Sequence, residues 1–139
     1  VYRKVCEMAA LARFLMGREV TKRRLPRGRG TILFTGATAG LRGSAGFAAF
    51  AGAKHALRAL AQSMARELGP QGIHVAHVVV DGAIDTRFIA ENFPERYALK
   101  ERDGILSPDA IAENYWNLHC QHKSAWTHEL DLRPWLESW

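Results

Sequence analysis

The fold is decided by two stretches, TILFT at residues 31–35 and IHVAHVVV at residues 73–80. Apolar residues dominate both stretches, which indicates strands covered on both faces, as in a parallel sheet. The small-residue turn GATAG, at residues 36–40, and a long helical segment lie between them. This strand–helix–strand order predicts a βαβ unit, and its right-handed crossover makes the two strands parallel.

Two long helices are predicted by apolar residues that recur at helical spacing. The first covers residues 4–24 and ends before Pro26 and Gly28, and the second covers residues 47–68 and ends at Gly69. The apolar stripe of the first helix consists of Val5, Met8, Ala12, Leu15 and Val20. The stripe of the second consists of Phe50, Ala53, Leu57, Leu60, Met64 and Leu68. We expect both helices to flank the sheet.

The start of the second helix is rich in small residues, which leaves two interpretations open. The residues are Ala45, Gly46, Ala48, Ala49, Ala51, Gly52 and Ala53. Small side chains allow another backbone to approach closely, so they suit tight helix packing. They also suit the close approach of a cofactor.

The remainder of the chain predicts further helices and a third strand. Residues 87–106 are mixed and polar, and we expect a short helix pair or a mobile flap there. Ser107, with a proline after it, is a good N-cap for a helix over residues 108–119. Residues 125–132 alternate between apolar and polar, which predicts a strand over about residues 125–131.

Length and composition indicate one globular domain. The chain has 139 residues, of which 47% are hydrophobic and 24% are charged. Its net charge of +5 is uneven, since residues 1–30 hold nine Lys or Arg against two Glu. The basic run at residues 22–29 could bind phosphate or nucleic acid, or could be a solvated helix end. No aromatic residues interleave these charges, so the second interpretation is favoured and nucleic acid is not an expected partner.

Cysteine and histidine usage argues against disulfides and metals. Two cysteines, Cys6 and Cys120, are too few for a disulfide framework or a zinc site, so we expect a reducing, cytoplasmic location. No apolar run approaches the ~20 residues of a membrane span. His74 and His77 would point to opposite faces of their strand and are interpreted as packed side chains. The HCQH segment at residues 119–122 has no partner cluster, so no metal site is predicted.

Two motifs carry a family resemblance. The first is FAGAK at residues 50–54, in which Phe50 and Lys54 share one helix face because they lie four positions apart. The second is DGAIDT at residues 81–86, directly after the second strand. Together with the element order, they resemble the C-terminal half of a short-chain dehydrogenase/reductase. The resemblance implies an α/β fold, namely the C-terminal half of a Rossmann-like, doubly wound parallel sheet with three α/β/α layers.

The resemblance implies catalytic positions that this chain has altered. The family carries Tyr-x-x-x-Lys, in which tyrosine is the general acid/base and lysine lowers its pKa and binds the nicotinamide ribose. Phe50 stands at the tyrosine position and Lys54 at the lysine position. The family's carbonyl-polarising serine lies thirteen positions before the tyrosine, where this chain has Ala37, with Thr38 and Ser44 as the nearest hydroxyls.

The family's fourth catalytic group, an asparagine of the earlier helix, also has no counterpart. Its position falls near Ala9, and residues 1–91 contain no asparagine. Three of the four groups are therefore missing or displaced, and each such loss can cost orders of magnitude in rate.

The cofactor positions are better preserved. In the family, a Pro-Gly-x-Ile/Val-x-Thr loop holds the nicotinamide carboxamide and a phosphate. Gly82, Ile84 and Thr86 are in register with that pattern, while Asp81 replaces the proline. The resemblance therefore implies that these three residues and Lys54 contact NAD or NADP.

The resemblance also bears on domain organisation and assembly. The family's glycine-rich phosphate turn follows its first strand and has no counterpart in this chain. We therefore expect residues 1–139 to be a single partial Rossmann-like domain, running from the fourth helix to the C-terminus, without the N-terminal cofactor half. In the family, the two long helices pair across a twofold axis, which implies a homodimer or homotetramer through residues 4–24 and 47–68.

Three functional hypotheses follow. The first is an NAD(P)-linked oxidoreductase for a small carbonyl or alcohol, with Ser44, Thr38 or a water in place of the tyrosine. The second is a non-catalytic nucleotide-binding or scaffold protein on the same fold. The third, a basic nucleic-acid binder, has the least support. The glycine turn and the charged residue after the family's second strand would distinguish the first two.

Overall fold

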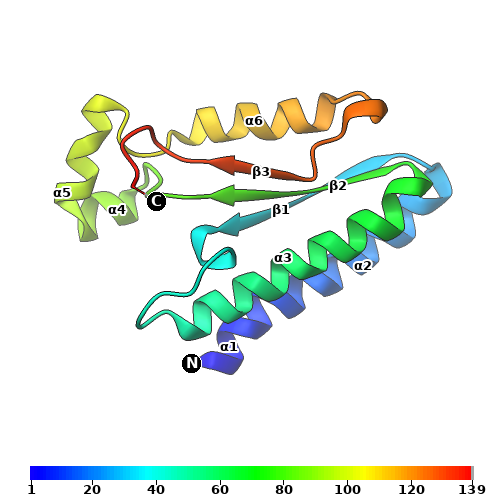
Figure 1. The fold of residues 1–139 in the computed structure, drawn as a ribbon, viewed down its shortest axis with the longest axis horizontal. Helices are drawn as coiled ribbons and strands as arrows, with labels where there is room; N and C mark the ends of the chain where they lie inside the picture. Colours follow the sequence, from blue (N-terminus) through cyan, green and yellow to red (C-terminus); the bar gives the residue numbers. More distant parts are fainter. Residues whose placement is uncertain (139) are drawn as a thin grey trace.

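The computed structural model, described here for residues 1–138, has three layers. Three parallel strands form the central sheet in the order β1-β2-β3 (Figure 1). They are β1 (Gly30–Ala37), β2 (Ile73–Val80) and β3 (Glu129–Leu132). Helices α2 and α3 cover one face of the sheet and α6 covers the other. This architecture confirms the predicted parallel α/β/α fold.

The predicted helices form close to their expected bounds. The α-helices are α1 (Tyr2–Cys6), α2 (Ala12–Arg24), α3 (Ala48–Leu68), α4 (Arg87–Asn92), α5 (Pro94–Tyr97) and α6 (Pro108–Cys120). A π-helical stretch at Glu7–Leu11 joins α1 to α2. Short 3-10 turns lie at Leu25–Arg27, Thr38–Gly40, Gly69–Gln71, Ala98–Arg102 and Lys123–Ala125. No helix within residues 1–138 has the length and apolar character needed to cross a bilayer.

Helix caps account for two of the boundaries. The Ser107 hydroxyl accepts a hydrogen bond from the Ala110 N–H at 3.4 Å and begins α6, as predicted. The Thr86 hydroxyl accepts from the Ile89 N–H at 3.3 Å and begins α4. The segment between these caps consists of short helices, which is one of the two predicted alternatives.

Strand β2 is the centre of the sheet and of the core. It pairs with β1 from Gly30 opposite Ile73 to Ala37 opposite Val80, and all of its eight residues are buried. Its side chains alternate between two apolar clusters, because successive residues of a strand face opposite sides. The cluster under α3 contains Ile32, Phe34, Leu57, Ala61, Met64, Leu68, Ile73 and Val75. The cluster under α6 contains Ala76, Val78, Val80, Leu106 and Leu118.

The two histidines of β2 lie on opposite faces, as predicted, and both are buried. His77 faces α3, and its Nδ1 lies 3.0 Å from a carboxylate oxygen of Glu129 on β3. Arg58 of α3 donates two hydrogen bonds to the same carboxylate, at 2.7 and 2.8 Å. These bonds lower the pKa of Glu129, while burial lowers the pKa of His77, so a neutral imidazole donates to a carboxylate. This junction ties α3, β2 and β3 together.

The third strand is shorter than predicted, because β3 begins at Glu129 rather than near residue 125. The side chain of Gln121 bonds both the backbone N–H of Thr127, at 2.7 Å, and its hydroxyl, at 2.8 Å. Trp126 stacks on His74 with ring centroids 4.8 Å apart. The described chain before Glu129 is therefore held by side-chain packing and hydrogen bonds, and only the carbonyl of His128 accepts a backbone hydrogen bond from β2, from the N–H of His77 at 2.7 Å.

The small residues at the start of α3 serve helix packing at one clear position. A Cβ on Gly52 would lie 3.4 Å from the hydroxyl oxygen of Tyr2, so α1 approaches this side of α3 closely. The neighbouring residues Ala51 and Ala53 are both buried. The packing interpretation of these small residues therefore holds at Gly52.

Gly36 is the position in β1 where the sheet leaves no room for a side chain. A Cβ there would lie 2.2 Å from Nε2 of the buried His77 ring. We predict that Gly36→Ala destabilises the protein by about 1–3 kcal/mol, because overpacking forces the ring or the strand to move. The measurement is the urea midpoint of unfolding. Gly43→Ala is the matched control, since nothing lies within 4 Å of a Cβ at Gly43. Equal midpoints for the two variants would contradict the prediction.

Candidate functional site

A large cleft opens at the carboxyl ends of β1 and β2. Its volume is about 790 Å³, and its walls come from the segment after β1, the start of α3, the loop after β2, and α4 and α5. In Figure 1 the strand arrows point toward α4 and α5. Open α/β sheets bind ligands at this edge, where loops and helix starts carry side chains past the strand ends.

Phe50 and Lys54 lie together, one turn apart on α3. The Lys54 Nζ is 5.6 Å from the centroid of the Phe50 ring and donates to the backbone carbonyl of Thr35 at 3.2 Å. Burial lowers the pKa of Lys54, and the positive charge of Arg13 lowers it further. Phe50 lines the cleft. At the position of the family's tyrosine, the chain therefore presents a phenyl ring without the ionisable hydroxyl.

Ala37, which stands at the family's serine position, lines the cleft at the end of β1 and carries no hydroxyl. The neighbouring hydroxyls of Thr38 and Ser44 belong to residues that line the cleft as well. Thr38 donates a short hydrogen bond to the carboxylate of Asp81. The hydroxyl nearest to the family's serine position is therefore held in place by a carboxylate.

Asp81, which replaces the family's proline, is a structural centre of the cleft floor. It is buried, it accepts from Thr38, and it lies 3.7 Å from the guanidinium of Arg133. Arg133 also pairs with Asp131 at the end of β3. Asp81 therefore connects the loops that follow all three strands.

The backbone of the loop at residues 82–86 is held in place by hydrogen bonds to Leu106. Ile84 pairs with Leu106 in a parallel bridge, through the Leu106 N–H to Ala83 carbonyl bond at 2.8 Å and the Asp85 N–H to Leu106 carbonyl bond at 2.9 Å. The N–H and carbonyl of Ile84 itself point to the other side of the extended segment. The Asp85 carboxylate pairs with Lys100 at 2.8 Å, and this bond lowers the pKa of Asp85.

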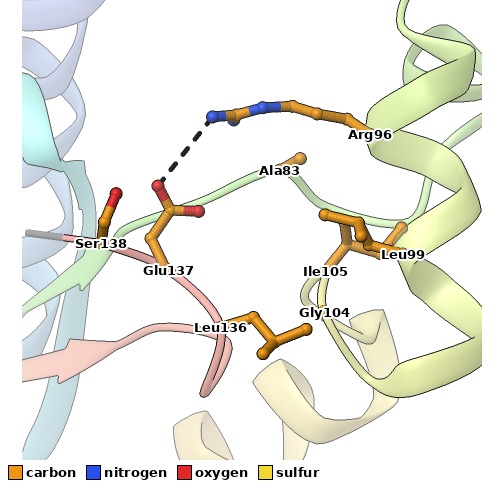
Figure 2. Close-up of a pocket in the computed structure, with 8 residues that line it drawn as sticks. All are labelled: Ala83, Arg96, Leu99, Gly104, Ile105, Leu136, Glu137 and Ser138. Carbon is orange, nitrogen blue, oxygen red and sulfur yellow. Dashed lines mark ion pairs between the residues drawn. The ribbon is translucent and has the colours of Figure 1, made fainter.

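The C-terminal segment closes over this loop. Gly82 has a φ of +139°, and a Cβ there would lie 2.9 Å from Cδ of Pro134. Beside it lies a smaller hollow of about 120 Å³, shown in Figure 2. Arg96 and Glu137 face each other across this hollow, with Arg96 Nη2 4.0 Å from Glu137 Oε1, and both residues also line the large cleft.

The sequence interpretation missed several residues of the cleft. Glu137 lines the cleft from the C-terminal segment, and Phe88 and Phe93 line it from a segment for which the sequence predicts only a short helix pair or a mobile flap. Arg133, also of the C-terminal segment, contacts the cleft residue Asp81. No sequence signal connects these residues to Asp81, because the contacts depend on how the loops meet beyond the strand ends. Of the residues that the sequence motifs single out, the cleft is lined by Ala37, Thr38, Ser44, Phe50, Asp81 and Gly82, whereas Lys54, Ile84 and Thr86 are not among its lining residues.

The residues present fit part of a nicotinamide nucleotide site. The backbone groups of Ile84 can pair with a carboxamide, and the Thr86 hydroxyl, which accepts from the backbone, keeps its own proton to donate. The Lys54 ammonium keeps two of its three N–H groups for a ribose or phosphate, since one goes to Thr35. The described residues 1–138 bring no group of three His, Cys, Asp or Glu side chains into an arrangement that could hold a metal ion.

Comparison with curated proteins gives partial-length relatives. The chain is 30% identical over 118 residues to the uncharacterized oxidoreductase YbbO of Escherichia coli K12, covering 80% of this chain and 43% of that protein. It is 44% identical over 75 residues to the cyclic-di-GMP-binding biofilm dispersal mediator protein of the same strain, covering 53% and 31% respectively. The chain thus spans between about a third and less than half of these relatives.

Solved structures agree. A short-chain dehydrogenase from Rhodopseudomonas palustris matches 96% of this chain and 52% of its own length, with a TM-score of 0.76 and 49% identity. A 4-hydroxyisoleucine dehydrogenase mutant complexed with NADH and succinate matches 96% of this chain and 58% of its own length, with a TM-score of 0.80 and 26% identity.

The family profile covers most of the chain. The profile described as short chain dehydrogenase matches residues 1–96, which include α1 to α4, the first two strands and the DGAIDT loop. Together with the cleft geometry and the relatives, this match shows that the chain belongs to the short-chain dehydrogenase family.

Proposed function

We propose that this protein is a nicotinamide-nucleotide-binding oxidoreductase of divergent type, which acts slowly on ordinary small carbonyl or alcohol substrates. The observation that carries the proposal is the position of the Lys54 ammonium beside the ring of Phe50, which lines the cleft. The lysine keeps the family's binding charge, while the ring beside it has no proton to transfer. Whether NAD or NADP is preferred depends on residues outside this chain.

In this proposal the chain's own residues bind and orient the nucleotide. Lys54 and Thr86 would donate hydrogen bonds to it, and the backbone of Ile84 would pair with its carboxamide. Gly82, which has no side chain, allows Pro134 to pack against this loop. A bound nicotinamide would supply or accept a hydride. The complexes of related structures with NADH support this assignment.

A proton must also move in carbonyl reduction, and two hydroxyls could take part. Thr38 is the better candidate than Ser44, because its hydroxyl is oriented by the Asp81 carboxylate. However, a hydroxyl that donates to this carboxylate is not free to polarise a carbonyl. The expected proton transfer is therefore weaker than with a phenol one helical turn before a lysine.

A second candidate is a nucleotide-binding protein without carbonyl chemistry. The phenylalanine and alanine at the family's tyrosine and serine positions favour it, as does the similarity to a relative named for cyclic-di-GMP binding. Here the same cleft would hold a nucleotide and transmit its presence to a partner. The absence of turnover in the presence of tight nucleotide binding would select this candidate.

Assembly into a homodimer or homotetramer is part of the proposal. The helical segment over residues 2–24 exposes a series of large apolar side chains: Met8, Leu11, Phe14, Leu15 and Met16. Contiguous exposed apolar surface of this kind marks an interaction site. A reducing, cytoplasmic location is also proposed, since Cys6 and Cys120 are both unpaired.

The first prediction from this proposal concerns nucleotide binding. Lys54→Ala should weaken the binding of NADH by about 10–100-fold, because it removes charged hydrogen bonds to the ligand. A titration followed by nicotinamide fluorescence measures this change in the intact protein. Lys22→Ala is the matched control, since Lys22 pairs with Glu19 on the exposed side of α2. Equal affinities for the two variants would remove Lys54 from the site.

The second prediction concerns catalysis. Phe50→Tyr alone should raise carbonyl reduction only slightly, because Ala37 still leaves the carbonyl unpolarised. Ala37→Ser alone should also have a small effect. The double variant should reduce carbonyls about 100-fold faster than the unmodified protein. This gain exceeds the sum of the two single gains, since the effects of groups that act as a unit are not additive. A substrate-panel assay of the four proteins measures this.

One outcome of the same assay would contradict the catalytic assignment. If the unmodified protein turns over rapidly and Lys54→Ala leaves that rate unchanged, the chemistry lies elsewhere in the protein. The residue-by-residue transfer of roles from the family would then be wrong, whatever the nucleotide affinity.

The third prediction concerns assembly. At micromolar concentration the protein should sediment as a dimer or a larger oligomer, and Leu11→Glu should shift it toward monomer by placing a charge on the exposed apolar face. Phe88→Glu is the control, since Phe88 is also exposed but lies on α4. A stable, soluble monomer before any substitution would rule out this interface.

A further inference from the structure

Four phenylalanines gather at the large cleft without being buried by the chain itself. Phe47, Phe50, Phe88 and Phe93 expose 56%, 39%, 63% and 48% of their surface, and all four line the cleft. Phe88 and Phe93 already contact each other edge to face, with centroids 6.0 Å apart. Exposed aromatic surface that converges on a hollow marks a ligand site. A ligand that covers these rings must present a sizeable apolar body.

The charged side chains of the same cleft differ in whether they already have a partner within the chain. Its two carboxylates are already engaged, since Asp81 is bonded to Thr38 and paired with Arg133, and Glu137 pairs with Arg96. Within residues 1–138, the guanidinium of Arg42 makes no hydrogen bond or ion pair. Among the described residues, the charged group of the cleft that has no partner is therefore Arg42, and arginine prefers planar anions such as carboxylates, which it binds through two parallel hydrogen bonds.

We propose that the cleft takes a small molecule with one apolar body and one carboxylate, that is, an apolar oxo acid or hydroxy acid. Arg42 binds the carboxylate, and the four phenylalanines cover the body. That the ligand also carries a reactive carbonyl or hydroxyl group rests on the proposed function. The binding of its carboxylate by Arg42 does not depend on that function. A cationic ligand does not fit, because each carboxylate of the cleft already has a partner.

A free phosphate is the alternative anion that Arg42 could bind, and it differs from the proposed carboxylate ligand in the residues that it can contact. It would bind Arg42 without covering the aromatic rings, whereas the proposed ligand needs both. The two can therefore be distinguished by removing either the charge or the body from the probe. The same comparison separates a specific site from general attraction to a protein of net charge +5.

The experiment measures binding of three matched probes by isothermal titration calorimetry: 3-phenylpropionate, 3-phenylpropan-1-ol and 3-phenylpropylamine. The acid should bind at least about tenfold more tightly than the alcohol, and the amine most weakly. Arg42→Gln should abolish the preference for the acid while leaving the affinity for the alcohol unchanged. Arg87→Gln is the matched control and should keep the preference, since Arg87 pairs with Glu91 on the exposed side of α4.

Two further arms test the apolar half of the site. Phe88→Ala should weaken the binding of the acid and of the alcohol by the same factor, because it removes contact with the phenylpropyl group that both probes share. Inorganic phosphate should not displace the acid at equal concentration. Equal binding of acid and alcohol, loss of the preference in Arg87→Gln, or displacement by phosphate would each overturn the proposal.

A parallel NADH titration keeps this inference distinct from the proposed function. If NADH binds and the acid shows no preference over the alcohol, the carboxylate site is wrong while the nucleotide-binding function stands. If the acid binds with the expected dependence on Arg42 and NADH does not bind, the carboxylate site stands and the nucleotide function fails.

Discussion

The burial of β2 on both faces and along both edges is the constraint on which the rest of the structure depends. All eight of its residues are buried, so a helix must cover each face and a strand must pair with each edge. The pairing of Ala37 with Val80 ends β1 and β2 at the same level. As a result, Thr38 and Asp81, which follow those ends directly, lie close enough to form a hydrogen bond. The cleft floor is thus a consequence of sheet register.

Two chemical tendencies meet in this cleft. In the proposed function, the loop after β2 and Lys54 keep groups that suit a nucleotide, while Phe50 and Ala37 stand where the family has the residues that move a proton and polarise a carbonyl. Asp81, which stands in place of the family's proline, adds polar contacts between loops. Its carboxylate accepts a hydrogen bond from Thr38 and pairs with Arg133. The loops beyond the sheet are therefore joined by polar contacts at the point where the chemistry would occur.

Two groups of exposed apolar side chains in the described chain suit different occupants. The face of the helical segment over residues 2–24 is broad and helical, as expected for contact with another protein chain. The phenylalanines around the cleft line a concave surface next to an unpaired arginine, as expected for a small anionic ligand. Charge and curvature distinguish these two surfaces, although their exposed fractions are similar.

The sequence by itself determined the order of strands and helices, the parallel pairing, the N-cap at Ser107, and the placement of Phe50 beside Lys54. These features depend on local periodicity or on spacing along one helix, and a single sequence contains both. The tertiary structure alone decided that β3 begins at Glu129, that His77 fills the space beside Gly36, that Glu137 and Phe93 reach the cleft, and that Arg133 contacts Asp81. Those contacts join segments far apart in the chain, and their geometry is set by how the loops pack after the strands have paired.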